Sequence, residues 1–225
     1  MFRSSLYFIG CRKSSAQIIL CKGSDFMASS KTRFTAQALC LTCILAVLSY
    51  VCFTFIQFKI PLPGGDATSI HLGNMVPVLG ALLFGGIYGG LGGAIGMTLG
   101  DLLDPVYIVY APKTFILKFC IGFIAGLVAD KVFHLKDQRN RQKMMTGAIV
   151  SAAAGLAFNA IFDPLLGYVY KLLILGRSVA DITLTWDVAA CVINAVISTA
   201  VSVALYMALR PALEKSGLLA QFGKN

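Results

Sequence analysis

Residues 60–130 read IPLPGGDATSIHLGNMVPVLGALLFGGIYGGLGGAIGMTLGDLLDPVYIVYAPKTFILKFCIGFIAGLVAD and decide the fold. The stretch holds two glycine-dense apolar segments, a turn with Asp101 and Asp104, and a third apolar segment that includes Lys118. Its apolar length indicates membrane helices, and its glycine density indicates that these helices pack very closely. Polar groups are costly in such surroundings, so the few that are present point to a small-molecule site.

The whole chain has the composition of a membrane protein. Of its 225 residues, 57% are hydrophobic and 13% are charged, whereas soluble domains carry about 25% charged residues. Because a membrane helix needs about 20 apolar residues, the chain has room for about six spans and for no separate soluble domain. We therefore expect an all-α membrane protein, a bundle of six transmembrane helices.

Prolines, paired glycines and charged runs divide the chain into apolar spans. We expect these spans at residues 34–58, 70–84, 87–103, 114–132, 144–166 and 186–209. Residues 59–69 are expected to form a loop, since proline and paired glycine do not continue a helix. The expected organisation is a poorly ordered N-terminal extension at 1–33, with Met27 as a candidate start of translation, a substrate-binding domain at 34–210 and a cytoplasmic tail at 211–225.

The net charge of +9 reflects membrane orientation rather than nucleic-acid binding. Lysine and arginine collect near the ends of spans, as the positive-inside rule requires. Lys31 and Arg33 precede the first span, residues 131–143 hold five basic residues, and Arg210 and Lys215 follow the sixth span. We expect a multi-pass protein of the cell membrane with both termini in the cytoplasm.

No residue pattern points to catalysis, a metal ion or a cofactor. The sequence lacks a Walker A motif, a G-x-S-x-G motif and an H-E-x-x-H motif, and it has only two histidines. Cys40 and Cys43 form a C-x-x-C pair, but they lie inside an apolar segment and no second pair accompanies them. We expect no enzyme activity, no cofactor and no metal site.

Small residues recur every four positions in the first three spans. This spacing places bare backbone along one helix face and lets two helices approach closely. One interpretation is packing within the chain, and the other is a smooth face that docks on another membrane subunit. The docking candidates are Ala38, Thr42, Ala46, Gly85, Gly89 and Gly93.

Polar and aromatic residues gather near one end of the expected bundle, which is the outer end in the topology above. Lys118 either reaches the membrane interface along its aliphatic stem, or anchors a polar group of a substrate, or pairs with Asp101. Convergence of such groups in one layer is typical of a small-molecule pocket. The candidate substrate-binding residues are His71, Asn74, Asp101, Tyr107, Tyr110, Lys118, Asn159, Asp163 and Trp186.

Several motifs resemble the substrate-binding S components of energy-coupling factor (ECF) transporters, and most of all their riboflavin-transporter-like group. The motifs are Gly64–Gly65, Phe84–Gly86, Gly100–Leu103, Tyr107–Thr114 and Lys118. The chain departs from that group at Gly86, where proline is usual, at Gly100, where alanine is usual, and at Lys113, where a small residue is usual. Lys113 therefore raises the question of the charge of the ligand.

The resemblance implies the fold and the partners of an ECF S component. Such a subunit captures a vitamin or related micronutrient, here with riboflavin-like cargo by group likeness, under the loop between the first two spans. It docks through small residues of the first three spans on a transmembrane coupling subunit. That subunit carries two ATP-binding-cassette ATPases, which hydrolyse the ATP.

Two other functions stay open from the residues alone. A self-sufficient secondary transporter or channel often has two related halves with matched broken helices. In this chain the glycine-rich character is confined to the second and third spans. A membrane scaffold protein is the other alternative, and it predicts no tight binding of a small molecule.

Overall fold

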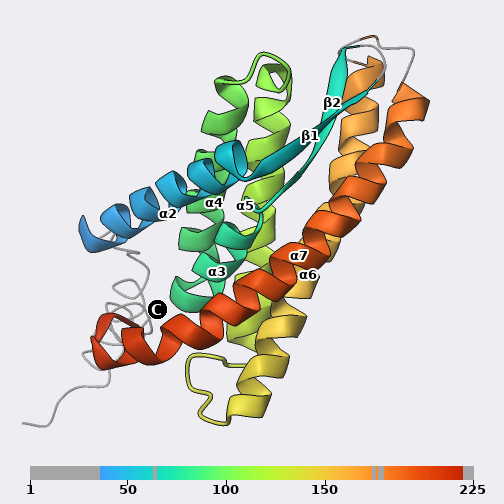
Figure 1. Cartoon of the computed structure of the whole chain (residues 1–225). Helices are drawn as coiled ribbons and strands as arrows, with labels where there is room; N and C mark the ends of the chain where they lie inside the picture. The colour runs from blue at the N-terminus through green and yellow to red at the C-terminus, as the bar shows by residue number, and fades with distance from the viewer. Residues whose placement is uncertain (1–35, 63–64, 174–175, 177–179, 220–225) are drawn as a thin grey trace, which may run out of the picture. The chain divides into compact units, whose positions relative to one another are not determined.

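A computed structural model describes residues 36–62, 65–173, 176 and 180–219 of the chain. Within these residues it contains the expected six α-helices, together with a β-hairpin and two short helical turns (Figure 1). The expected extension at 1–33, with Met27, and residues 220–225 lie outside the described residues. In chain order the elements are α2 (Ala36–Phe55), β1 (Gln57–Leu62), β2 (Asp66–His71), α3 (Met75–Phe84), α4 (Gly86–Leu102), η1 (Ile108–Tyr110), α5 (Ala111–Leu127), η2 (Val128–Val132), α6 (Arg141–Leu173) and α7 (Ala180–Lys215).

Three helices are long and apolar enough to cross a bilayer, namely Ala36–Phe55, Arg141–Leu173 and Thr183–Lys215. Helices α4 and α5 have 17 residues each, and the π-helical turn η2 continues α5 without a break. Helix α3 has only 10 residues, which at about 1.5 Å per residue reach halfway across a hydrocarbon core of about 30 Å. Gly85 separates α3 from α4 with a φ of 108°, a conformation that favours glycine.

The segment expected as a loop at 59–69 is instead an antiparallel β-hairpin. Strand β1 pairs with β2 in a register that runs from Gln57 opposite His71 to Leu62 opposite Asp66. The prediction of a helix from residue 70 is therefore wrong at its start, because residues 66–71 belong to β2. Pro61 is tolerated because a two-stranded sheet leaves an unpaired edge on each strand. In Figure 1 the hairpin reaches from the end of α2 across to α6 and α7.

The last two helices are longer than the sequence predicted. Helix α6 continues through Pro164 to Leu173, beyond the expected end at residue 166. Helix α7 continues through Arg210 and Pro211 to Lys215, so these two residues do not end it. The extension of α6 falls in the segment expected to be a connection, at 167–185, and the extension of α7 falls in the expected cytoplasmic tail at 211–225. The longer α6 adds functional groups to the site described below.

Arg210 fastens the loop after η2 to α7. Its guanidinium donates hydrogen bonds to the backbone carbonyls of Leu135 at 2.7 Å, Lys136 at 3.2 Å and Gln138 at 3.0 Å. It also donates to the Tyr206 hydroxyl at 2.5 Å and forms an ion pair with Glu214. Because these contacts use the whole guanidinium fork, Arg210 fixes this loop instead of ending the helix.

Helix α4 is the centre of the bundle, and its glycines face three neighbouring helices. Gly92, Gly96 and Gly100 lie against α2, Gly89 and Gly93 against α3, and Gly86 and Gly90 against α5. At Gly92 a Cβ atom would lie 2.5 Å from the Cβ of Leu45, and at Gly90 it would lie 2.7 Å from the carbonyl oxygen of Phe119. The backbones therefore approach more closely than any larger residue would permit, as in glycine-based packing of membrane helices.

Apolar side chains cover the outside of the helices, and polar side chains are buried among the apolar residues of the inside. Ile44 and Val47 of α2, Ile161 of α6 and Val196 of α7 are among the most exposed large residues. Buried polar residues include Ser49, Ser151, Ser198 and Ser202. The many apolar side chains on the outside suit helices whose outer surface meets lipid.

Replacing Gly89 with alanine is expected to destabilise the protein. The new Cβ would collide with the backbone nitrogen of Ala81 and the carbonyl oxygen of Pro77, and neither backbone atom can move without shifting α3. Overpacking of this kind costs about 1–3 kcal/mol, measurable as a lower unfolding temperature in detergent. Gly167→Ala is the matched control, because its Cβ would meet only the flexible end of Lys113; an equal loss in both variants would contradict the packing argument.

Candidate ligand-binding pocket

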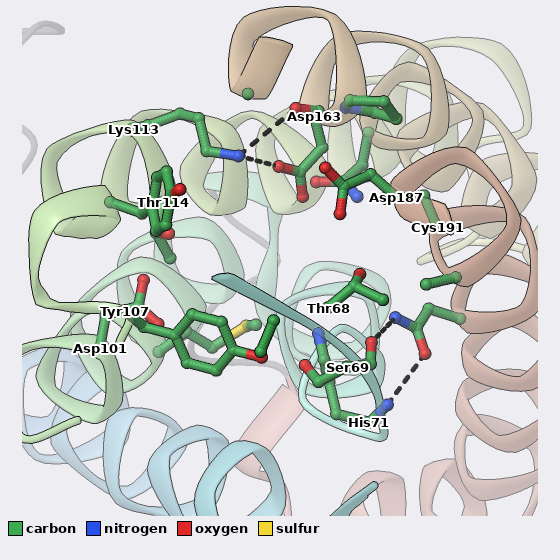
Figure 2. Close-up of a pocket in the computed structure, with 18 of the residues that line it drawn as sticks. Thr68, Ser69, His71, Asp101, Tyr107, Lys113, Thr114, Asp163, Asp187 and Cys191 are labelled. Carbon is green, nitrogen blue, oxygen red and sulfur yellow. Dashed lines mark hydrogen bonds and ion pairs between the residues drawn. The ribbon is translucent and has the colours of Figure 1, made fainter. Parts of the chain in front are cut away.

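A pocket of about 110 Å³ lies between the hairpin and four helices. Strand β2 forms one wall, α4 and α5 form the second, and α6 and α7 form the third (Figure 2). The aromatic and apolar lining comes from Phe53, Met97, Tyr107, Tyr110 and Ala190. The polar lining comes from Asp66, Thr68, Ser69, His71, Asn74, Asp101, Lys113, Thr114, Lys118, Asn159, Asp163, Lys171, Asp187, Cys191 and Asn194.

The structure brings eight of the nine predicted site residues to this pocket. They are His71, Asn74, Asp101, Tyr107, Tyr110, Lys118, Asn159 and Asp163. Trp186, the ninth, does not line it and is 51% exposed. It lies on α7 next to Asp187, which does line the pocket. Adjacent residues of a helix point in different directions, so Trp186 faces away from the pocket.

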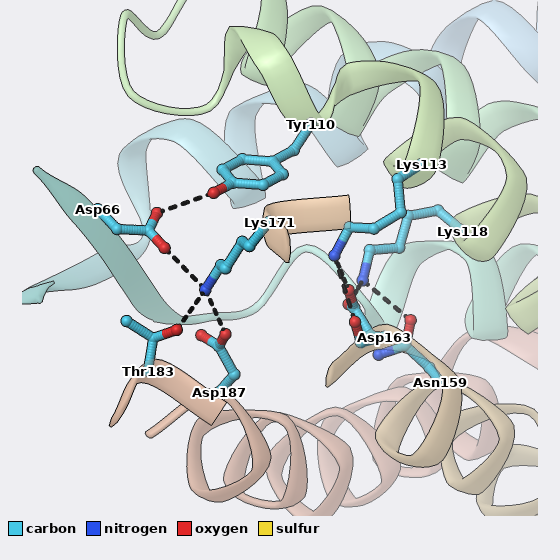
Figure 3. A network of polar contacts seen from close by, with 9 residues as sticks. All are labelled: Asp66, Tyr110, Lys113, Lys118, Asn159, Asp163, Lys171, Thr183 and Asp187. Atoms are coloured by element: carbon cyan, nitrogen blue, oxygen red, sulfur yellow. Dashed lines mark hydrogen bonds and ion pairs between the residues drawn. The ribbon is translucent and has the colours of Figure 1, made fainter. Parts of the chain in front are cut away.

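The first polar network, the Asp163 cluster, consists of Lys113, Lys118, Asn159 and Asp163 (Figure 3). The Lys118 ammonium lies 2.9 Å from Asp163 Oδ2 and 3.0 Å from Asn159 Oδ1, and its side chain is 5% exposed. The Lys113 ammonium lies 2.5 Å from Asp163 Oδ1. One carboxylate on α6 thus compensates two lysines on α5.

The Asp163 cluster settles two expectations about Lys118. Its buried ammonium rules out the interpretation that the side chain extends to the membrane interface. The alternative in which Lys118 pairs with Asp101 is also wrong, because Lys118 pairs with Asp163. Asp101 lines the pocket together with Thr114, which lies one helical turn before Lys118 on α5.

The second network, the Lys171 cluster, joins the hairpin to the last two helices and consists of Asp66, Tyr110, Lys171, Thr183 and Asp187 (Figure 3). The Lys171 ammonium lies 2.7 Å from Asp66 Oδ2, 2.6 Å from Asp187 Oδ2 and 3.1 Å from the Thr183 hydroxyl. The Tyr110 hydroxyl donates to Asp66 Oδ1 at 3.2 Å. The side chain of Asp66 is 1% exposed, so this ion pair is almost fully removed from water.

Asn194 binds strand β2 to α7 through its side-chain amide. Its Oδ1 accepts a hydrogen bond from the backbone N–H of His71 at 2.9 Å, and its Nδ2 donates to the carbonyl oxygen of Ser69 at 2.9 Å. This pair of bonds copies the pairing of a neighbouring strand. On the other strand, Lys59 forms an ion pair with Asp104 in the loop after α4. The hairpin is therefore attached on both sides of the pocket.

Two pocket residues outside the helices are held in their uncharged forms. His71 Nδ1 accepts a hydrogen bond from the Gly73 N–H at 3.2 Å. Burial, and then the charge of Lys118, lower the pKa of His71 to about 3, so the imidazole is neutral at physiological pH. Burial raises the pKa of Tyr107 to about 12, so its phenol keeps a proton that it can donate.

The polar lining residues that the sequence analysis missed come from β2, α5, α6 and α7. Asn159, Asp163, Gly167 and Lys171 follow one another at intervals of four, which places them along one face of a helix. That pattern would have identified Lys171, but it continues only if the helix passes through Pro164 and Gly167. Asp66, Asp187 and Asn194 carried no signal of their own in the sequence.

The six candidate docking residues are all buried in contacts within the chain. Ala38, Thr42 and Ala46 of α2 face α4, where a Cβ on Gly96 would collide with the carbonyl oxygen of Ala46. Gly89 and Gly93 face Pro77 of α3. Packing within the chain thus occupies these residues, and a role in docking on another subunit stays a prediction for the surface next to them.

A comparison with protein families adds an independent finding. Residues 33–211 match the family described as ECF-type riboflavin transporter, S component. The match covers most of the chain, including every residue of the pocket. The comparisons with curated proteins and with solved structures gave no match.

Replacing Asp163 with asparagine is expected to destabilise the protein, because it leaves two lysines in the pocket without a carboxylate. Removing one partner of a buried ion pair costs about 3–5 kcal/mol, measurable by denaturant unfolding in detergent. Asp130→Asn is the matched control: it breaks the more exposed pair with Lys136, and such pairs contribute about 0–1 kcal/mol. Equal stability of the two variants would show that Asp163 does not hold the lysines.

Proposed function

The chain belongs to the family of ECF-type riboflavin transporter S components, and from this premise we propose that its pocket binds riboflavin. It is a substrate-binding membrane subunit of an ECF importer, and neither an enzyme nor a self-sufficient transporter. As a member of this family it is a multi-pass membrane protein. The family also implies a vitamin as the substrate.

The observation that carries the proposal is the combination of aromatic and hydrogen-bonding groups in one pocket. Riboflavin has a flat ring system with an apolar edge, a polar edge with carbonyl and N–H groups, and a chain of hydroxyls. Phe53, Met97 and Tyr107 offer apolar surface to a ring. The Asp163 cluster offers ammonium and amide donors to ring carbonyls, and the Lys171 cluster offers carboxylate acceptors to hydroxyls.

Asn74 supports a ligand with an N–H or O–H donor. It lines the pocket and is 1% exposed, and its Oδ1 accepts no hydrogen bond from the described residues. Leaving a buried acceptor unsatisfied costs about 1–3 kcal/mol. A donor on the ligand would remove that cost, which makes Asn74 a candidate for recognising the polar edge of the ring.

The size of the pocket supports entry by movement of the hairpin. Its volume of about 110 Å³ is below the roughly 300–1,000 Å³ of typical small-molecule sites, so a flavin must displace part of the wall. The hairpin is the wall held mainly by side chains, through Lys171, Asn194 and Lys59. We expect riboflavin to exchange its own hydrogen bonds for some of these contacts.

The placement of charge supports an outer position for the pocket. The pocket lies at the start of α5, and the basic residues Lys131, Lys136 and Arg139 follow the other end of this helix. Arg210 ties α7 to the loop at that basic end. Helix α2 runs in the same direction as α4, with Leu45 beside Gly92 and Phe53 beside Gly100, so it ends near the pocket and begins on the other side. By the positive-inside rule this end is cytoplasmic, so both termini would be cytoplasmic and the hairpin extracellular.

Transport would depend on partner subunits. We expect a transmembrane coupling subunit with two ATP-binding-cassette ATPases to supply the energy. The face of this chain that docks on the coupling subunit would lie on the outward side of α2. Leu39, Ile44 and Val47 are exposed there, beside the small residues that pack on α4.

Lys118→Ala is expected to weaken riboflavin binding more than Lys113→Ala does. Lys118 is the deeper lysine and contacts both Asn159 and Asp163. A hydrogen bond to a charged group contributes about 1.5–3 kcal/mol, so its loss should lower the affinity about tenfold or more. The affinity is measured by the quenching of flavin fluorescence when riboflavin is titrated with purified protein. Lys136→Ala, at the other end of α5, is the control; equal affinities of all three variants would remove Lys118 from the site.

ATP is expected to drive uptake only in the complete complex and only from one side. In vesicles containing this chain alone, no accumulation of riboflavin is expected. With the coupling subunit and ATPases added, ATP should drive uptake when it is on the side where a C-terminal tag is open to protease. Accumulation by the isolated chain under an ion gradient would refute the need for partners, and activity with ATP on the opposite side would refute the orientation.

A further inference from the structure

The charged groups of the pocket do not sum to a positive charge. Three lysines, Lys113, Lys118 and Lys171, are accompanied by four carboxylates, Asp66, Asp101, Asp163 and Asp187. His71 adds no charge, because its Nδ1 accepts a hydrogen bond from Gly73. The pocket therefore carries a formal charge of −1 despite its three lysines.

Each ammonium group is already bound to a carboxylate. Lys113 and Lys118 share Asp163, at 2.5 Å and 2.9 Å. Lys171 lies between two carboxylates, Asp66 at 2.7 Å and Asp187 at 2.6 Å. A new anion next to one of these lysines would therefore also lie next to the carboxylate that the lysine already binds, and two like charges in one buried site repel each other.

We propose that this pocket selects uncharged riboflavin against its 5′-phosphate, and that Asp187 is a residue that sets this discrimination. The inference rests on the proposed function, since it presupposes a flavin ligand. A hydroxyl at the end of the ribityl chain can donate to Asp66 or Asp187, whereas a phosphate at that position brings a second anion next to them.

Asp187 is the better of the two carboxylates to alter. Its side chain is 16% exposed, compared with 1% for Asp66, so a change at Asp187 disturbs the packing less. Asparagine keeps the shape and removes the charge, and Lys171 keeps Asp66 as its partner. In the Asp187→Asn variant the ammonium is then held by one carboxylate instead of two and is available to a phosphate.

The test measures the affinities of the purified full chain for riboflavin and for riboflavin 5′-phosphate at neutral pH. Flavin fluorescence reports both. The parent protein is expected to bind the phosphate at least about 100-fold more weakly, and Asp187→Asn should narrow this ratio about tenfold. Asp104→Asn is the matched control: it removes the same charge from the pair with Lys59, outside the pocket, and should leave the ratio unchanged.

The outcomes separate this inference from the proposed function. Equal binding of the two flavins by the parent overturns the inference alone, whereas failure of riboflavin to bind overturns the proposed function and the inference with it. A ratio that is the same in Asp187→Asn and in the parent refutes the role of Asp187. If Asp187→Asn does not fold, Lys171→Gln tests the same charge balance in the opposite direction, because it removes a positive charge. It should increase the preference for riboflavin over the phosphate. A smaller preference would contradict the proposal.

Discussion

Contact between helix backbones at the glycines of α4 is the constraint on which the rest of the structure depends. Lipid offers no hydrophobic force that drives helices together, so their association relies on close packing and on polar contacts between them. Gly89, Gly92 and Gly90 give α4 three bare sides, one each for α3, α2 and α5. The α5 side is reciprocal, since Gly122 of α5 meets the backbone of Gly90. This glycine-rich half of the bundle is the rigid support for one wall of the pocket.

The other half of the pocket is held by charge instead of by backbone contact. Helix α6 approaches α5 through the Asp163 cluster, and α6 and α7 hold the hairpin through the Lys171 cluster. Buried ion pairs add little net stability, since desolvation offsets most of the attraction, but they are costly to break. They also specify which groups face each other. The two clusters thus fix the geometry of the site while leaving contacts that a polar ligand can exchange.

The two ends of the bundle differ in what closes them. At one end Arg210 binds three carbonyls of a single loop, and only rearrangement of that loop would release it. At the other end the hairpin is held from three places, by Lys171 of α6, by Asn194 of α7 and by Asp104 in the loop after α4. Side-chain contacts of this kind can be replaced one at a time. This difference supports the proposal that the hairpin, and not the basic end, opens to admit riboflavin.

The sequence alone determined the class of the protein and predicted part of the lining of one pocket. Apolar length and glycine density predicted six helices in close contact, and eight of the nine candidate site residues line one pocket. Apolar length and glycine spacing depend on residues that are close together along the chain, so they can be recognised in the sequence itself. The tertiary structure decided what each residue contacts. It turned residues 57–71 into a hairpin, carried α6 through Pro164 to Lys171, and paired Lys118 with Asp163 instead of Asp101. Hydrogen-bonding and ion-pair partners that are 45 or more residues apart depend on how the helices pack, and no spacing in the sequence predicts these pairs.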